Sequence, residues 1–300
     1  MFTHCIIDFD QKKTLTDSTM KSLFLIIYIV LSIGSFNVFA KDITEAECVS
    51  ILKSVLLSEN IMKETSRIFP DLGKQKEDLL KDHYYWIGNN DSLLKKLAHD
   101  FNQTGLLKSD INLYPLEKRK RTLQITAQVM MESYYRIGLL KSSIEDLREF
   151  SKLALLSVKV MPYGHCKKYH FGPFDSKYYS QAISVQGKFY RFLTISQFRA
   201  YLAHYRRVID NALDERKQKR ELDPVTMDLA TKAFVNALGR TFSHLPAEKR
   251  ERLENALSYP ETASDKEACE AGNLVLKALD SLDGQPFVLA TTYILNETSK

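Results

Sequence analysis

Apolar residues recur at steps of three and four positions along most of the chain after residue 41, which is the period of an α-helix with one buried face. Glycine, proline and clusters of charged residues separate these stretches. The pattern therefore predicts a mainly α fold, an irregular bundle of about nine or ten helices. The stretch 116–137 is the longest example, with Leu123, Ala127, Met130, Tyr134 and Ile137.

Residues typical of helix starts support several of these boundaries. Thr44 and Glu47 have the spacing of a capping box, in which each side chain bonds the backbone of the other residue. Ser264 and Glu267 have the same spacing. The Asp-Pro pair at 223–224 places a capping residue before a proline at the first helical position. These signals predict helix starts near residues 45, 224 and 265.

Two stretches depart from the helical pattern. Residues 162–177 combine glycine, proline and aromatic residues, which predicts a structured loop. Near residues 180–195, two β-prone runs flank a Gln-Gly pair, which predicts one small β-hairpin. The loop would divide the chain into lobes 41–161 and 178–300, but we expect one integrated helical domain, 41–300.

Residues 20–40 have the three parts of a secretory signal peptide. Met20 and a lysine open it, residues 23–33 form its apolar centre, and Val-Phe-Ala ends it at Ala40. We expect cleavage after Ala40 and a periplasmic or secreted protein. An uncleaved anchor is the alternative, because the uncharged run approaches the ~20 residues that span a bilayer. Residues 1–19 have mixed charges and are expected to be an upstream extension, not structure.

The net charge of the chain, and its hydropathy after residue 40, limit the kinds of partner that we expect. The net charge of +5 is mild, so it does not by itself argue for nucleic acid. The basic runs 118–121 and 216–220 are typical of solvated helix ends, and an exported protein rarely meets nucleic acid. No second apolar run is long enough to span a membrane once the leader is removed. We therefore expect an unknown protein or cell-envelope partner.

Three cysteines remain after cleavage: Cys48, Cys166 and Cys269. In an oxidising compartment they predict one disulfide and one free thiol. We favour Cys48 with Cys269, because both follow predicted helix starts, and the pairing of Cys166 with either stays open. No C-x-x-C spacing or cofactor-binding loop occurs, so no metal site and no cofactor are expected.

One candidate for catalysis is Glu132, which precedes Ser133 near the end of an apolar helical stretch from residue 124. This Glu-Ser pair resembles the catalytic helix of lytic transglycosylases and related lysozyme-like enzymes. The resemblance implies that Glu132 is the general acid and base of a cell-wall hydrolase, with a pKa raised by apolar surroundings. The alternative is a solvated glutamate on a long helix.

A second group of candidates lies in the stretch predicted as a loop. Aromatic and imidazole side chains on a rigid loop give a large contact area at low entropic cost, so they predict a recognition surface. A metal site built from His165, Cys166 and His170 is disfavoured, because their spacing is not a known ligand pattern. The candidate binding residues are Tyr163, His165, Tyr169, His170 and Phe171.

These observations favour an exported, non-enzymatic binding or interaction module. A divergent lysozyme-like hydrolase that uses Glu132 is the alternative.

Overall fold

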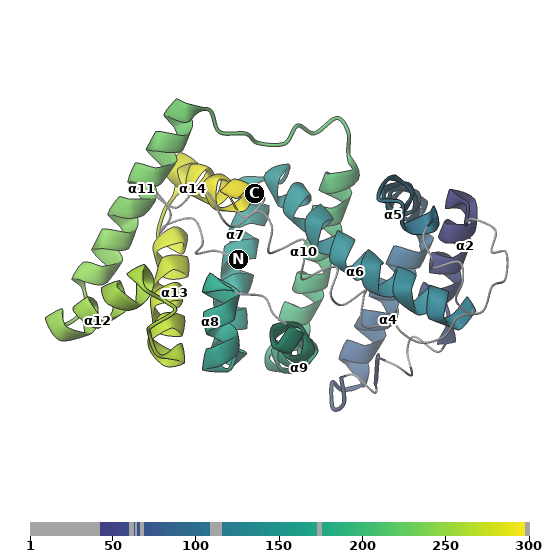
Figure 1. Ribbon diagram of the computed structural model, residues 1–300, viewed down its shortest axis with the longest axis horizontal. Coiled ribbons are helices and arrows are strands. Elements are labelled where there is room, and N and C mark those ends of the chain that lie inside the picture. Colours follow the sequence, from purple (N-terminus) through teal and green to yellow (C-terminus); the bar gives the residue numbers. More distant parts are fainter. Residues whose placement is uncertain are drawn as a thin grey trace. The chain divides into compact units, whose positions relative to one another are not determined.

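The chain is helical wherever the structure describes it (Figure 1). The computed structural model describes residues 43–59, 63, 65, 66, 69–108, 116–172 and 176–297. Twelve α-helices and two short 3₁₀ turns occur in these regions, and no strand does. The predicted upstream extension, signal peptide and cleavage site lie outside the described residues. The mainly α prediction is confirmed.

The chain separates into two compact units. The first, here the α10 unit, consists of residues 43–138 and 193–217. The second, here the α13 unit, consists of residues 139–192 and 218–297.

The α10 unit packs around the apolar face of α5. Five side chains of that helix are fully or almost fully buried, and residues of α2, α6 and α10 complete the same core. Thr44 and Glu47 form the predicted capping box at the start of α2. The elements of the unit are α2 (Glu45–Leu56), α4 (Lys74–Asn89), α5 (Asp91–Gln103), the 3₁₀ turn η1 (Leu106–Lys108), α6 (Leu116–Leu140) as far as residue 138, and α10 (Ile195–Leu213).

Two contacts hold α6 within the α10 unit. The hydroxyl of Tyr134 donates a hydrogen bond to the carboxylate of Asp100 at 2.5 Å. At Gly138, a Cβ would lie 1.9 Å from the carbonyl oxygen of Val208, so α6 and α10 approach too closely for any side chain there. This glycine permits a helix contact and does not end the helix, which continues to Leu140.

The α13 unit is organised around α13, the helix with most buried residues in that unit. It contacts α7, α8, α11, α12 and α14, and nine of its sixteen residues are buried. Ser264 caps its start by accepting a hydrogen bond from the backbone of Glu267, as predicted. The elements of the unit are α7 (Ile144–Ser157), the 3₁₀ turn η3 (Val158–Val160), α8 (Tyr163–Phe171), α9 (Ser176–Phe192), α11 (Pro224–Ser243), α12 (Ala247–Ser258), α13 (Asp265–Asp280) and α14 (Gly284–Glu297).

Two arginines bind the carbonyl groups at helix ends in the α13 unit. The guanidinium of Arg148 donates to the carbonyls of Asp280, the last residue of α13, and of Leu282, and it lies 3.7 Å from the ring centre of Phe287. Arg220, part of the basic run at 216–220, donates to the carbonyl oxygens that end α6. Because the last carbonyls of a helix have no partner within it, both arginines satisfy groups that would otherwise need water.

The predicted loop and hairpin are wrong, and both segments contain helices. Within 162–177, Pro162 is the N-cap of α8 and Gly172 is its C-cap with a φ of 66°, so these residues border a helix without interrupting it. The segment 180–195 contains most of α9, because its apolar residues also recur at helical spacing, as with Val185 and Phe189, which are four positions apart and buried. These additional helices explain why the described chain has twelve and not nine or ten.

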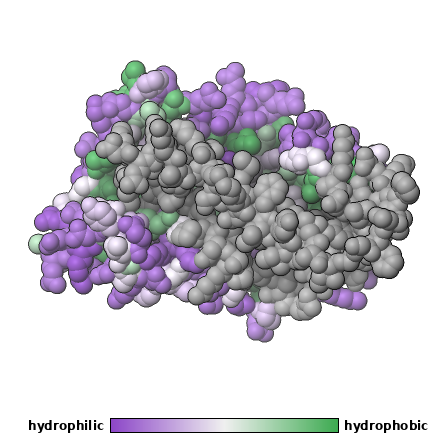
Figure 2. Space-filling view, viewed as in Figure 1, coloured by the Kyte–Doolittle hydropathy of each residue, from purple (hydrophilic) through white to green (hydrophobic). Residues whose placement is uncertain are grey.

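Nine large apolar side chains are exposed among the described residues, and four of them belong to α11. On the face shown in Figure 2, most coloured residues are hydrophilic and the hydrophobic ones form small separate groups. None of the described helices combines the length and the hydropathy that crossing a membrane requires.

Candidate functional site

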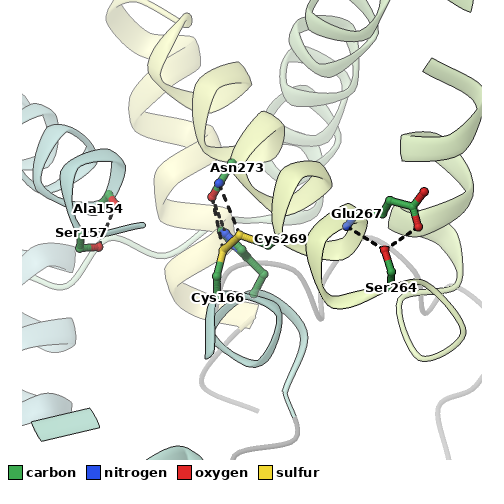
Figure 3. The surroundings of a disulfide bond; sticks show 8 residues. Ala154, Ser157, Cys166, Ser264, Glu267, Cys269 and Asn273 are labelled. Carbon is green, nitrogen blue, oxygen red and sulfur yellow. Dashed lines mark hydrogen bonds between the residues drawn. A yellow bond between two sulfur atoms is a disulfide. The ribbon is translucent and has the colours of Figure 1, made fainter. Parts of the chain in front are cut away.

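A disulfide between Cys166 and Cys269 joins α8 to α13 (Figure 3). The favoured pairing of Cys48 with Cys269 is therefore wrong. Cys48 is a free thiol, fully buried in the core of the α10 unit, and burial raises its pKa to about 12. Because Cys166 is bonded to sulfur, it is not available as the thiolate ligand that a metal site would need.

The side chains of α8 divide between the interior and a pocket. His170 and Phe171 are buried, and Tyr169 is partly buried. The Nε2 atom of His170 bonds the side-chain oxygen of Asn273 at 3.0 Å, and burial lowers the pKa of His170 to about 4. Burial raises the pKa of Tyr169 to about 12. These three residues pack the unit, whereas Tyr163 is 52% exposed.

Only His165 among the five predicted binding residues lines the pocket beside α8. This pocket, here the α8 pocket, has a volume of about 310 Å³. Pro162 and Gly172, the two caps of α8, also line it. The side chains that give it chemical character come from three helices of the unit and are His165, Lys167, Lys168, Gln181 and Asp265.

The disulfide and a close approach at Gly164 bring α8 and α13 together at the pocket. A Cβ on Gly164 would lie 2.8 Å from the Oδ2 atom of Asp265, so the carboxylate lies against the first turn of α8. This arrangement is favourable, because the positive end of the helix dipole attracts a negative charge. Asp265 begins α13 one turn before Cys269, so the disulfide fixes the same two helix turns that carry the pocket.

Among the described residues that line the pocket, two are lysines and one is an aspartate. The ammonium of Lys167 donates to the carbonyl of Ala263 at 2.8 Å and lies 3.5 Å from the carboxylate of Asp265. Lys168 adds a second cation, and its charge, together with burial, lowers the pKa of His165. Burial is the larger cause. His165 therefore stays neutral near pH 7.

His165 is held in place by stacking. Its ring lies parallel to that of Tyr178, with the ring centres 4.3 Å apart, and the residue is 3% exposed. Its Nδ1 atom is buried without a hydrogen-bond partner. Buried polar atoms are almost always paired, so this nitrogen is a hydrogen-bonding group without a protein partner; the Nδ1 atom of His170 shares this property but does not line the pocket.

Glu132 does not line this pocket and belongs to α6 in the α10 unit. The residue is exposed, yet the protein around its carboxyl raises the pKa above the ordinary value through desolvation. Its charge contributes to the raised pKa of the buried phenol of Tyr205, although burial and Tyr201 contribute more. A carboxyl pKa raised above the ordinary value is one feature of a general acid, and Glu132 has this feature.

The sequence did not identify Lys167, Lys168, Gln181 or Asp265 as site residues. The lysines follow His165 directly and could have been included with it. Gln181 and Asp265 belong to distant parts of the chain, and only the fold brings them to α8.

No protein-family model, curated protein or solved structure matches this chain.

Proposed function

We propose that the mature chain is an exported, non-enzymatic binding module whose ligand site is the α8 pocket. The observation that supports this most is a cavity of about 310 Å³ beside His165, which is buried with an unpaired ring nitrogen. Ligand sites are cavities of about 300 Å³ or more with a few placed polar groups, and this pocket is at the lower limit. It therefore suits a small ligand, or one terminus of a larger one.

Export is the second part of the proposal, and two features support it. The pattern of residues 20–40 is that of a secretory leader. A disulfide such as Cys166–Cys269 persists in oxidising compartments and is rare in reducing ones. Mass spectrometry of the protein purified from cells should give Lys41 as the first residue. A peptide that begins before Met20 would contradict the proposed start and leader.

The binding role is tested by filling the pocket. Thermal unfolding of the purified mature chain would be measured with small polar molecules and cell-envelope fragments, each at constant ionic strength. Gln181→Trp places a large side chain in the pocket from α9, and Ser184→Trp changes an exposed position on the same helix that does not line it. We expect a stabilising ligand whose effect is lost with Gln181→Trp and kept with Ser184→Trp. A screen without any stabilising compound, or one whose shifts persist in Gln181→Trp, would refute the proposal.

The alternative function is a cell-wall hydrolase that uses Glu132, and the raised pKa of this carboxyl favours it. The variant Glu132→Gln keeps the size of the side chain and removes its proton. If the chain is a hydrolase, the parent protein should release fragments from purified peptidoglycan and Glu132→Gln should not. Equal activity of the two proteins, or none in the parent, would exclude this role.

A further inference from the structure

We propose that the loop between α10 and α11 is a processing site, at which a protease specific for basic residues cuts the mature chain after Lys217. The cut gives two polypeptides, 41–217 and 218–300. Three features carry the proposal: the exposure of the loop, the hydrogen bonds that leave one basic position accessible, and the place of the disulfide between Cys166 and Cys269.

The loop consists of residues 214–223 and joins α10 to α11 (Figure 1). It is the longest stretch without helix in the part of the chain that the structure describes, and residues 215–219 are all exposed. A protease holds its substrate in an extended form, so a helix must open locally before it is cut, whereas an exposed loop is cut directly. Residues 215–219 therefore present peptide bonds that a protease can reach without unfolding a helix.

Three basic residues lie in this exposed part: Arg216, Lys217 and Lys219. A protease of this specificity receives a lysine or arginine side chain in an acidic pocket and cuts the peptide bond that follows it. The side chain of Arg216 is 90% exposed, and its ion pair with Asp214 at 2.9 Å contributes little because it lies at the surface. Lys217 is also exposed, although its ammonium donates to the side chain of Asn211.

Arg220 ends the accessible part of the loop. Its backbone N–H donates to the carbonyl of Leu140 at 3.0 Å, and its guanidinium donates to the carbonyls of Leu139 and Ser142. Arg220 is therefore held at the end of α6, and the peptide bond between Lys219 and Arg220 is held with it.

The peptide bond between Lys217 and Gln218 is more accessible than its neighbours. The bond before it contains the N–H of Lys217, which closes a turn on the carbonyl of Asp214 at 3.2 Å. The N–H of Gln218 makes no hydrogen bond to another backbone group among the described residues, and both Lys217 and Gln218 are exposed. We therefore place the cut after Lys217.

The reaction is a hydrolysis. The bond between the carbonyl carbon of Lys217 and the nitrogen of Gln218 breaks. The carbon takes the hydroxyl of a water molecule and the nitrogen takes its proton, so Lys217 gains a carboxylate and Gln218 an ammonium group.

The disulfide joins the two products, because Cys166 belongs to the first polypeptide and Cys269 to the second. The residues of the α8 pocket are divided in the same way. Asp265 lies on the second polypeptide, and the other residues that line the pocket lie on the first. After the cut, the disulfide is therefore the one covalent link between the two sides of the pocket.

The accessibility of the loop is tested by brief digestion of the oxidised chain 41–300 with trypsin. The loop and α12 each have three basic residues at the same intervals: Arg216, Lys217 and Lys219 in the loop, and Lys249, Arg250 and Arg252 in the helix. We expect the loop to be cut at least about ten-fold faster than α12, because the helix must open first. The product should be one band on a gel without reductant and two bands with it.

Processing is tested in the cells that produce the protein, with the parent and two variants. Arg216→Gln/Lys217→Gln/Lys219→Gln removes the basic residues of the exposed part and keeps Arg220. Lys249→Gln/Arg250→Gln/Arg252→Gln is the matched control on α12. Circular dichroism would confirm that each purified variant is folded.

We expect the parent and the α12 variant to separate into two polypeptides on reduction, with Gln218 as the first residue of the smaller one by mass spectrometry. The loop variant should remain a single chain. The proposal is overturned if the parent from these cells is a single chain after reduction, if the loop variant is cut as the parent is, or if trypsin cuts α12 as fast as the loop.

Discussion

Removing the disulfide between Cys166 and Cys269 should destabilise the α13 unit strongly. The two cysteines are 103 residues apart, so the bond closes a long loop in the unfolded chain. In the chain-entropy description, a loop of about 100 residues corresponds to about 4.7 kcal/mol at 25 °C. Residual structure in the unfolded chain reduces such values, so we expect the double variant Cys166→Ser/Cys269→Ser to lose about 3–5 kcal/mol.

The assay is urea unfolding of the mature chain, followed by two signals. Far-ultraviolet circular dichroism reports all the helices. Trp86 is the single tryptophan and lies in the α10 unit, so its fluorescence reports that unit separately. Both the parent and the variant would consist of residues 41–300 and carry Cys48→Ala, which removes the one other thiol of that segment and prevents exchange.

The circular dichroism transition should show the loss in free energy of unfolding. The fluorescence of Trp86, which reports the α10 unit, serves as the internal reference. Reduction of the parent with excess dithiothreitol should reproduce the effect of the double variant. A loss below about 1 kcal/mol in both experiments would refute the argument from loop closure, since it predicts a loss several times larger.

Three further outcomes follow from contacts in the two units. Gly272→Ala should destabilise the α13 unit by about 1–3 kcal/mol, because the new Cβ would lie 2.3 Å from the ring of His170. Gly239 has open space around it, so Gly239→Ala should stabilise the chain by about 0.5–1 kcal/mol. Equal effects of the two variants in urea unfolding would contradict the packing argument. Arg148→Met keeps the apolar stem but loses the hydrogen bonds at the end of α13, so it should lower the free energy of unfolding by about 2 kcal/mol in the same assay. An unchanged free energy would show that water replaces these hydrogen bonds. Burial, assisted by the charge of an arginine, lowers the pKa of His83 to about 3, below its ordinary 6.5. Between these two values the unfolded chain binds a proton that the folded chain does not, so the free energy of unfolding should fall as the pH decreases from 6.5 towards 3. His83→Gln should reduce this pH dependence, measured by unfolding across the same range.

Helix starts were predictable because their signals are local. The side chain of Thr44 and the backbone of Glu47 are three positions apart, and their mutual hydrogen bonds need nothing from the rest of the chain. The same holds for Ser264, which accepts from the backbone three residues on. Apolar spacing of three and four residues predicted the helical class for the same reason.

The errors occur where a distant part of the chain decides the local structure. Gly164 weakens a helix on intrinsic propensity, but in α8 it makes room for the carboxylate of Asp265. Gly138 allows the carbonyl of Val208 to approach α6. In both places local propensity predicts that the glycine interrupts a helix. In the structure the glycine instead allows a close contact with a distant part of the chain.

The cysteine pairing and the candidate site were missed for one shared reason. Cys48 and Cys269 follow predicted helix starts, whereas Cys166 lies in a stretch predicted as a loop, and that difference favoured the wrong pair. In the structure Cys166 also follows a helix start, so this local feature does not distinguish the cysteines. The distinction is that Cys48 lies in the core of the α10 unit, while Cys166 lies opposite Cys269. Predicting the bond would have required the division into units, and that division depends on the packing of α13.

The position of the disulfide connects the stability of the α13 unit to the proposed binding role. Cys166 is next to both His165 and Lys167, so the crosslink holds the turn of α8 whose side chains line the pocket. Its partner Cys269 lies one turn after Asp265 on α13. A ligand that prefers this arrangement of the two turns stabilises the oxidised chain, and by thermodynamic reciprocity the disulfide increases the affinity for that ligand. The dissociation constant of a ligand of the pocket should therefore be larger for the reduced protein than for the oxidised one, and the ratio measures how much of the binding site the disulfide organises.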